Sequence, residues 1–323
     1  MAPAPPRWQL EQSQAAASHL SEGQACTTPT MSCYHPVKAY SLASGGISFS
    51  ERGDILGDIK VPCGRCIGCR LRRASDWSLR IGHEAQMHKQ SWFVTLTYDD
   101  PHLPTPPSLN YREFQRFMKR LRKAHEGPVR FFMCAEYGER TRRPHYHAVL
   151  FGLQLSDLGR YGGPDDQPLF VSAWLTNLWG LGTVMIGAVT PKSAQYVARY
   201  NLKKVTGDLA EYHYAWVDEE GVVHQLEPEF CHMSTRPGIG ATWYSKFCTD
   251  VHTHDYVIRD GVKNPVPRYY DKLATRRDDF EIDLLRQQRV KTARMKADNN
   301  TPERLAVREE VAKARAQLKQ RLL

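Results

Sequence analysis

The sequence predicts an α+β fold, an antiparallel sheet with helices on one face in a ferredoxin-like arrangement. One observation is four segments with the alternation and the β-branched or aromatic residues of strands, at 92–98, 129–137, 145–153 and 182–190. Another is the short turn 138–144 between the two middle segments, which indicates an antiparallel hairpin. The third is helical spacing between and after the strands, which gives the order β-α-β-β-α-β-α.

The expected helices follow from apolar spacing and from one proline. From Phe114 to Leu121, apolar residues recur at i, i+3, i+4 and i+7, which predicts a helix beginning near Ser108. A shorter helix is expected at 172–179. Pro191 suits the first turn of another helix, because an N–H at that position would have no partner inside the helix.

Composition divides the chain into five regions. They are a disordered leader at 1–30, a Cys-rich basic segment at 31–90, the core at 91–206, an irregular extension at 207–270 and a charged helical tail at 271–323. The leader is rich in Ala, Pro, Gln and Ser, and the tail has more Lys and Arg than Asp and Glu. No internal repeat is visible.

Charge and cysteine content restrict the classes of function. Lys and Arg number 44 against 35 Asp and Glu, a formal charge of +9, which favours a polyanionic partner. No apolar run approaches the roughly 20 residues that cross a bilayer, and the N-terminus lacks the apolar stretch of a signal peptide. We therefore expect a cytoplasmic protein with no membrane partner, whose eight cysteines form no disulfide framework.

Two histidines on an expected strand form the first candidate site. His145 and His147 project from one face, because residues i and i+2 of a strand do so. The pair would bind a metal if a neighbouring strand supplied a third ligand, with Glu136 as first candidate and Glu139 as second. Such a site suits Mg²⁺ or Mn²⁺ acting on a phosphodiester. The alternative is that both histidines are ordinary polar residues of a solvated sheet face.

Two tyrosines on an expected helix form the second candidate site. Tyr196 and Tyr200 share a face, because residues i and i+4 of a helix are neighbours. A phenol is a poor nucleophile until its phenolate is stabilised, and Lys203 lies near the same stripe to do so. Two adjacent tyrosines permit two successive transesterifications. The alternative is that both tyrosines only pack on the sheet.

Four cysteines form the third candidate site. Cys63, Cys66 and Cys69 lie within seven residues, and Cys33 precedes them by thirty. Four thiolates suffice for a closed tetrahedral Zn²⁺ site that supports the fold. Free buried thiols and iron–sulfur ligation are the alternatives, and the spacing of the fourth cysteine is not that of a ferredoxin.

Basic and aromatic residues around these sites are candidate DNA contacts. The phosphate contacts expected are Arg65, Arg70, Arg72, Arg73 and Lys204. The candidates for stacking on unpaired bases are Trp92, Tyr98, Tyr137 and Tyr146, although Trp92 is equally expected in the core. The alternative for the basic run is a solvated helix face.

Taken together and in this order, the motifs resemble those of the HUH endonucleases that initiate rolling-circle replication. More narrowly, the chain resembles the replication initiation proteins of small single-stranded DNA microviruses of the gokushovirus type, over roughly residues 31–250. The segments that carry the resemblance are Met31–Pro36, Pro62–Arg70, Phe93–Tyr98, Glu136–Gly138, Arg143–His147 and Tyr196–Lys204. As an ordered set, the core motifs are specific.

The resemblance implies a Rep-type HUH fold, an activity and a set of partners. In that family the matching histidines, His145 and His147, bind the metal, and the matching tyrosines, Tyr196 and Tyr200, are the nucleophiles. Lys203 matches the lysine one turn beyond the second tyrosine. The substrate would be single-stranded DNA at the replication origin, and the product a 5′-phosphotyrosine adduct with a free 3′-OH. A host polymerase would extend that end, and a host helicase would unwind the duplex, because no helicase motif is visible.

Three other functions compete with this prediction. Another HUH enzyme, such as a plasmid initiator, relaxase or transposase, would share the chemistry, although the paired tyrosines and the cysteine segment favour the phage initiator. A non-catalytic, zinc-stapled DNA-binding protein would be indifferent to tyrosine substitution. A metal-dependent hydrolase using the histidines would leave no covalent adduct.

Overall fold

The structure of the chain, a computed structural model, covers five stretches. The residues that it describes are 33–165, 167–199, 204–205, 207–277 and 280–320. The expected leader at 1–30 lies outside them.

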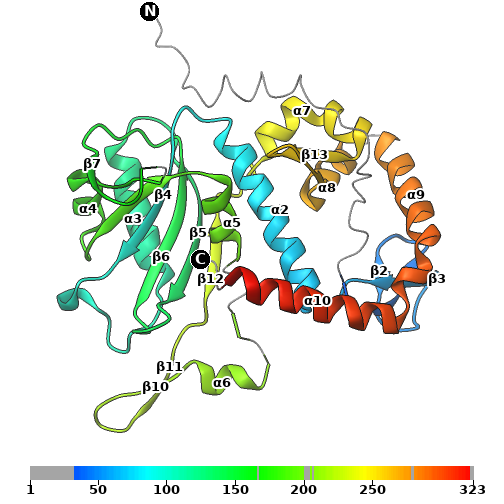
Figure 1. Cartoon of the computed structure of the whole chain (residues 1–323), viewed down its shortest axis with the longest axis horizontal. Coiled ribbons are helices and arrows are strands. Elements are labelled where there is room, and N and C mark those ends of the chain that lie inside the picture. Colours follow the sequence, from blue (N-terminus) through cyan, green and yellow to red (C-terminus); the bar gives the residue numbers. More distant parts are fainter. Residues whose placement is uncertain (1–32, 166, 200–203, 206, 278–279, 321–323) are drawn as a thin grey trace, which may run out of the picture.

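An antiparallel sheet forms the centre of one half of the molecule (Figure 1). Among the described residues its seven strands lie in the order β12 (Phe230–Met233), β5 (Arg130–Tyr137), β6 (Pro144–Phe151), β4 (Ser91–Thr97), β9 (Val184–Ala188), β8 (Leu169–Val171) and β7 (Gly159–Gly162). β5 and β6 form the expected hairpin, and β4 lies between β6 and β9. The α+β class with an antiparallel sheet is confirmed, and the four expected strands are β4, β5, β6 and β9.

Two of the expected helices cover one face of this sheet. They are α3 (Tyr111–Ala124) and α4 (Ala173–Trp179). Phe114, Phe117 and Trp179 of these helices are buried against Met133 and Leu150 of the strands. The apolar spacing of α3 in the sequence therefore marks the side that packs on the sheet.

The other face is also covered, by α2 (Ile67–Ala85) and α5 (Pro191–Arg199). Ile81 of α2 and Val197 of α5 share a buried cluster with Phe132 and Val149. The expectation of helices on one face is thus corrected. β5 and β6 carry apolar side chains on both sides, so both faces of these strands have to be shielded from water.

The N-terminal Cys-rich segment contains a small sheet that the sequence did not indicate. Its strands β1 (Val37–Leu42), β2 (Ile47–Ser48) and β3 (Ile55–Val61) lie in the order β2-β1-β3. These strands are short and largely exposed, so they lack a clear apolar alternation. α2 follows and runs between the two halves of the molecule (Figure 1).

The segment 207–270 is not the irregular extension that was expected. It contains α6 (Leu209–His213), β10 (Ala215–Val217), β11 (Val223–Gln225), β12, α7 (Ala241–His254), β13 (Tyr256–Arg259) and β14 (Val262–Pro265). The hairpin β7–β8 was missed as well. Strands of three or four residues are too short to show periodicity in sequence, and β12 is defined by its pairing with β5.

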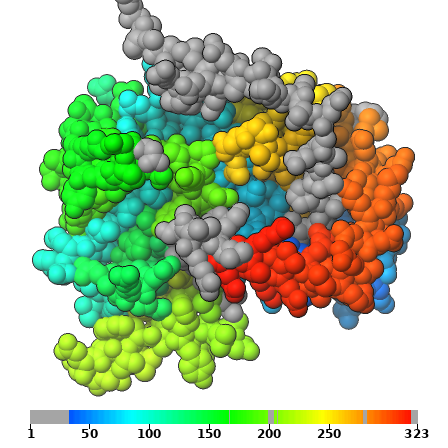
Figure 2. Space-filling model, in the orientation of Figure 1, coloured from blue at the N-terminus to red at the C-terminus, as the bar shows by residue number. Residues whose placement is uncertain are grey.

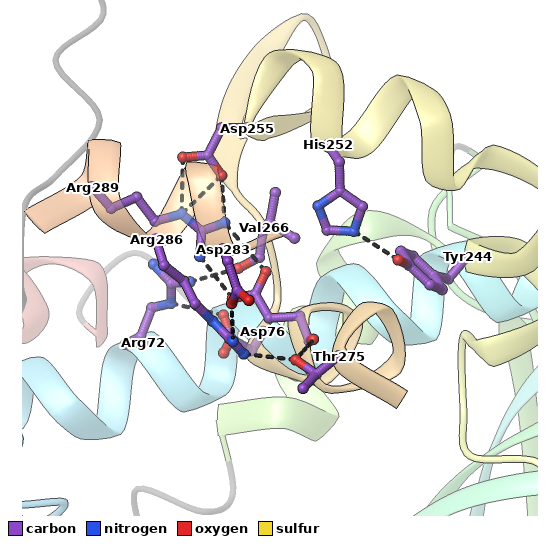
Figure 3. A network of polar contacts seen from close by, with 11 residues as sticks. Arg72, Asp76, Tyr244, His252, Asp255, Val266, Thr275, Asp283, Arg286 and Arg289 are labelled. Carbon is purple, nitrogen blue, oxygen red and sulfur yellow. Dashed lines mark hydrogen bonds and ion pairs between the residues drawn. The ribbon is translucent and has the colours of Figure 1, made fainter. Parts of the chain in front are cut away.

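The expected helical tail consists of α8 (Arg268–Arg276), α9 (Phe280–Met295), a short turn, η3 (Ala297–Asn300), and α10 (Pro302–Gln320). In Figure 2, α9 (orange) and α10 (red) lie on the visible surface, and in Figure 1 α10 passes the N-terminal end of α2, which it contacts. Polar contacts hold these helices to their neighbours (Figure 3). Arg289 pairs with Asp255 and Asp271, and Arg72 of α2 donates to Asp76 and to the carbonyl of Val266.

No helix among the described residues combines the length and the apolar character that crossing a membrane requires.

Candidate functional site

The histidine pair lies on β6, on the face covered by α2 and α5. The β5–β6 register places Glu136 directly opposite His145, so the three expected metal ligands project from the same face. Glu139, the second candidate, lies in the turn after β5, exposed to solvent and outside this cluster. The cluster of Glu136, His145 and His147 is called the histidine site below.

One carboxylate oxygen holds the histidine site together. Glu136 Oε1 lies 2.8 Å from His145 Nε2 and 3.1 Å from His147 Nε2. Potential ligand atoms from the three residues lie within 4.8 Å of one another. The donor set, one carboxylate and two imidazoles, fits a divalent cation such as Mn²⁺ or Mg²⁺.

The outer nitrogens of both rings have partners that orient them. His145 Nδ1 lies 3.2 Å from the carbonyl oxygen of Arg143, and His147 Nδ1 lies 2.9 Å from Thr95 Oγ1 on β4. A carbonyl oxygen can only accept, so Nδ1 of His145 carries the proton and Nε2 keeps its lone pair for a ligand. Neither Thr95 nor Arg143 was identified from the sequence, because their contacts depend on strand register and turn geometry.

The carboxylate is charged despite its burial. Glu136 is 3% exposed. Burial acts to raise its pKa, but the hydrogen bonds from His145 and His147 outweigh burial and lower the pKa of Glu136 to about 2. The site therefore holds a fixed negative charge next to two imidazoles, which is what a metal cation requires.

One of the two expected nucleophiles lies beside the histidine site. Tyr196, on α5, is 43% exposed, and its ring stands edge-on to the ring of His147 with 5.4 Å between centroids. Phe93 of β4 stacks on His147 at 5.5 Å and contacts Tyr196 edge-on, so it fixes both rings. This role of Phe93 was not visible in the sequence. Tyr200 and Lys203 lie outside the described residues, so their assignment stays a prediction.

The four cysteines of the N-terminal segment form a second cluster, remote in sequence from the first. Cys33 and Cys66 are buried, and Cys63 and Cys69 are half-buried. Their sulfur atoms lie within 4.8 Å of one another. The cluster of these four residues is called the cysteine site below.

The basic residues expected to bind DNA fall into two groups. Arg65, Arg73 and Lys204 are exposed, which leaves their side chains open to phosphate. Arg70 is half-buried and donates to the carbonyl of Lys204 at 3.2 Å, and Arg72 is held by its bonds to α2 and to the β14–α8 junction. The phosphate contact stays a prediction for all five.

Three of the aromatic residues considered for base stacking are too buried to reach a base. Tyr98 and Tyr137 are each 6% exposed and Tyr146 is fully buried, all in the core cluster beneath α3 and α4. Tyr98 and Tyr146 donate to groups near the start of α3, so their hydroxyls serve the fold. Trp92 packs against the same cluster. Strand alternation predicted their shared face, and that face is the apolar one.

Comparison with known proteins places this geometry in a family. A family model described as a replication-associated protein of the ORF2 type matches residues 91–205, the stretch that runs from β4 through the tyrosine segment. No solved structure matches the chain.

Three phage proteins are similar to the chain. Replication-associated protein VP4 of Bdellovibrio phage phiMH2K is 32% identical over 252 residues, which cover 74% of this chain and 76% of that protein. Replication-associated protein ORF2 of Spiroplasma virus 4 is 31% identical over 293 residues, covering 82% and 87%. Replication-associated protein ORF4 of Chlamydia phage 1 is 31% identical over 180 residues, covering 53% and 41%. The chain therefore belongs to the family of phage replication-associated proteins, the one that its resemblance to microvirus initiators predicted.

Proposed function

We propose that this protein initiates rolling-circle replication by nicking single-stranded DNA at the origin of its replicon, with tyrosine as nucleophile. The observation that carries the proposal is the position of Tyr196, whose exposed ring stands against His147 of the histidine site. A nucleophile next to a cation-binding cluster is the arrangement that phosphoryl transfer from DNA to tyrosine needs. Membership of a family of replication-associated proteins fits this role.

The proposed step is a transesterification. The phenol oxygen of Tyr196 forms a bond to the scissile phosphorus while the bond from phosphorus to the 3′ oxygen breaks. The phenol proton leaves to solvent, and the departing 3′ oxygen takes up a proton. The products are a 5′-phosphotyrosine and a free 3′-OH, and the phosphodiester bond energy is kept for a later ligation.

The residues of the histidine site divide the remaining work. Glu136 supplies the negative charge, and Nε2 of both histidines faces that carboxylate. Mg²⁺ or Mn²⁺ held there would polarise the scissile phosphate and stabilise the charge that develops on it. Thr95 and the carbonyl of Arg143 keep the rings in place, so little reorganisation is needed when DNA binds.

Tyr200 and Lys203 enter the proposal from their sequence spacing and the family resemblance. Tyr200 is the second nucleophile, which resolves the product by a second transesterification, and Lys203 stabilises negative charge on phenolate or phosphate. Exposed Arg65, Arg73 and Lys204 are the proposed contacts to the DNA backbone. A host polymerase would extend the 3′-OH, and a host helicase would open the duplex.

The test is a covalent adduct on a denaturing gel. The full chain is mixed with labelled single-stranded DNA that spans its own origin, with Mn²⁺ or with EDTA. We expect a metal-dependent, denaturant-resistant band that persists in Tyr196→Phe or Tyr200→Phe alone and disappears in the double variant. Tyr161→Phe is the matched control, because Tyr161 is a tyrosine exposed on β7 at the opposite sheet edge from β12.

The other outcomes identify other functions. Cleavage without an adduct would point to a metal-dependent hydrolase. If folded, metal-loaded protein bound the origin without cutting it, the DNA-binding alternative would replace the proposal. A band unaffected by the double variant would place the nucleophile elsewhere.

A further inference from the structure

Pairing of two strands brings the cysteine site together. Cys33 precedes β1 and Cys63 follows β3, and β1 and β3 run antiparallel with Val37 opposite Val61. The two chain ends beyond this pair are therefore neighbours. The chain then enters α2, whose N-cap residue is Cys66 and whose first turn contains Cys69.

The spacing of the sulfur atoms fits one tetrahedral ion. Zn–S bonds of about 2.3 Å in a tetrahedron place the sulfurs about 3.8 Å apart. Cys66 Sγ and Cys33 Sγ are 4.0 Å apart, and the whole set lies within 4.8 Å. A disulfide needs about 2.05 Å, and these cysteines are free. An iron–sulfur cluster holds its thiolates on separate irons, hence farther apart.

Backbone amides already point at the sulfur atoms. The N–H of Cys63 donates to Cys33 Sγ at 3.2 Å, that of Cys66 to Cys63 Sγ at 3.4 Å and that of Tyr34 to Cys66 Sγ at 3.4 Å. The turn between Cys63 and Cys66 depends on Gly64, whose φ of +76° strongly favours glycine. Amide donors stabilise the thiolate form, and that form is the one that binds zinc.

The charge of a zinc centre also suits this end of α2. Four thiolates and Zn²⁺ carry a net charge of −2. In the described structure the first turn of α2 has no acidic residue, and Cys66 makes no side-chain capping bond there. An anionic centre would offset the positive end of the helix dipole and face the basic neighbours Arg65 and Arg73.

We propose that Cys33, Cys63, Cys66 and Cys69 bind one structural Zn²⁺ that positions α2, and through α2 the tyrosine helix α5. α2 packs along α5, with Ile81 and Val197 in one buried cluster. Next to Cys69, Arg70 donates to the carbonyl of Lys204, just beyond the tyrosine segment. The zinc site itself stands on the cysteine geometry alone, and the positioning role rests on the proposed function.

The first measurement is metal content. Full-length protein purified without added metal should contain one zinc per chain by mass spectrometry, and growth in cobalt should give the absorption of tetrahedral thiolate-bound Co²⁺. Cys63→Ser should lose the metal, whereas Cys63→His should keep it, because histidine can replace one thiolate. Cys248→Ser is the matched control, from a cysteine on α7 outside the site. Zinc-free wild type, iron in place of zinc or zinc retained by Cys63→Ser overturns the site.

The second measurement is the rate of adduct formation under single-turnover conditions. Cys63→Ser should react about 10- to 100-fold more slowly than wild type, because a misplaced nucleophile costs that much, and Cys63→His should recover most of the rate. A Cys63→Ser protein that folds, lacks zinc and nicks at the wild-type rate overturns the positioning role. Zinc bound as expected in a wild type that forms no adduct supports the site and contradicts the proposed function, so the two failures are distinguishable.

Discussion

The histidine site and the cysteine site place metal-ligand atoms equally close together, yet the two are built differently. The histidine site takes three ligands from adjacent strands of one sheet, and the exposed ring of Tyr196 stands beside it. The cysteine site takes four ligands from two segments that a strand pair and a helix start bring together. Three ligands leave positions for a substrate, whereas four thiolates close a tetrahedron.

The difference separates chemistry from scaffolding. Residues around the histidine site orient rings toward a shared carboxylate, which prepares a place for charge to develop. Around the cysteine site, backbone amides and arginines connect the start of α2 to the rest of the chain. α2 is the element that links the two, because it begins at one site and packs on the helix that carries the nucleophile of the other.

The largest effect is expected from removing both imidazoles. His145→Gln/His147→Gln should lower the rate of adduct formation on the order of 10³-fold, because the cation is lost while the amides still donate to buried Glu136. Zinc content and thermal stability should stay close to wild type. Single-turnover gels and metal analysis check both. His254→Gln, from an exposed histidine on α7, is the control. A loss of zinc in the double variant would show that the two sites are not independent.

The next effect concerns the anchor of α2 in the helical half. His83 is buried, stacks on Trp243 and bonds to Tyr270 Oη at 2.8 Å. Burial, with the nearby charge of Arg259, lowers the pKa of His83 from 6.5 to about 3. Between these values the unfolded chain binds a proton that the folded chain does not, so stability falls as pH drops below 6.5.

From pH 7 to pH 5, this histidine alone should cost about 2 kcal/mol of the free energy of unfolding. Urea unfolding at the two pH values measures the loss, and His83→Gln should remove most of that difference whatever its effect at pH 7. His254→Gln should keep the wild-type difference. An unchanged pH dependence in His83→Gln would mean that His83 is not the titrating group.

A smaller effect is expected from the partner of His147. Thr95→Val keeps the shape of the side chain but removes the hydroxyl that contacts Nδ1. The Mn²⁺ concentration for half-maximal nicking should rise about tenfold, with little change in the saturated rate, because outer partners tune ligand affinity. Thr97→Val is the matched control, since Thr97 Oγ1 bonds to the carbonyl of Thr183 instead. Equal curves for both variants would contradict a role for Thr95.

Long periodic elements were predictable from sequence, and pairing between distant segments was not. α3 shows its buried side every third or fourth residue, and β5 and β6 form a hairpin across a short turn. β12 joins the sheet almost a hundred residues after its partner β5, and no local pattern marks it. The second helix layer was missed because α5 is short and α2 is highly charged.

The candidate sites divide in the same way. His145, His147 and Glu136 could be proposed together because one hairpin carries them. Thr95 and Phe93 could not, because their contact with His147 depends on the register between β4 and β6. Cys33 was grouped with the other cysteines by residue type alone, and the pairing of β1 with β3 is the physical reason that it lies beside them.

The smallest effect tests whether the flank of the cysteine site also contacts DNA. Arg73 is exposed, whereas its neighbour Arg72 is held by Asp76 and the carbonyl of Val266. Arg73→Ala should lower the salt dependence of single-strand binding by about 0.7 in the log–log slope, the value for one phosphate contact, with no loss of stability. Arg72→Ala should instead lower the free energy of unfolding by about 1 kcal/mol and leave the slope unchanged. Fluorescence anisotropy across a salt series and urea unfolding measure the two quantities. An unchanged slope in Arg73→Ala would confine the cysteine site to holding α2, because its exposed flank would then make no contact with the nucleic acid.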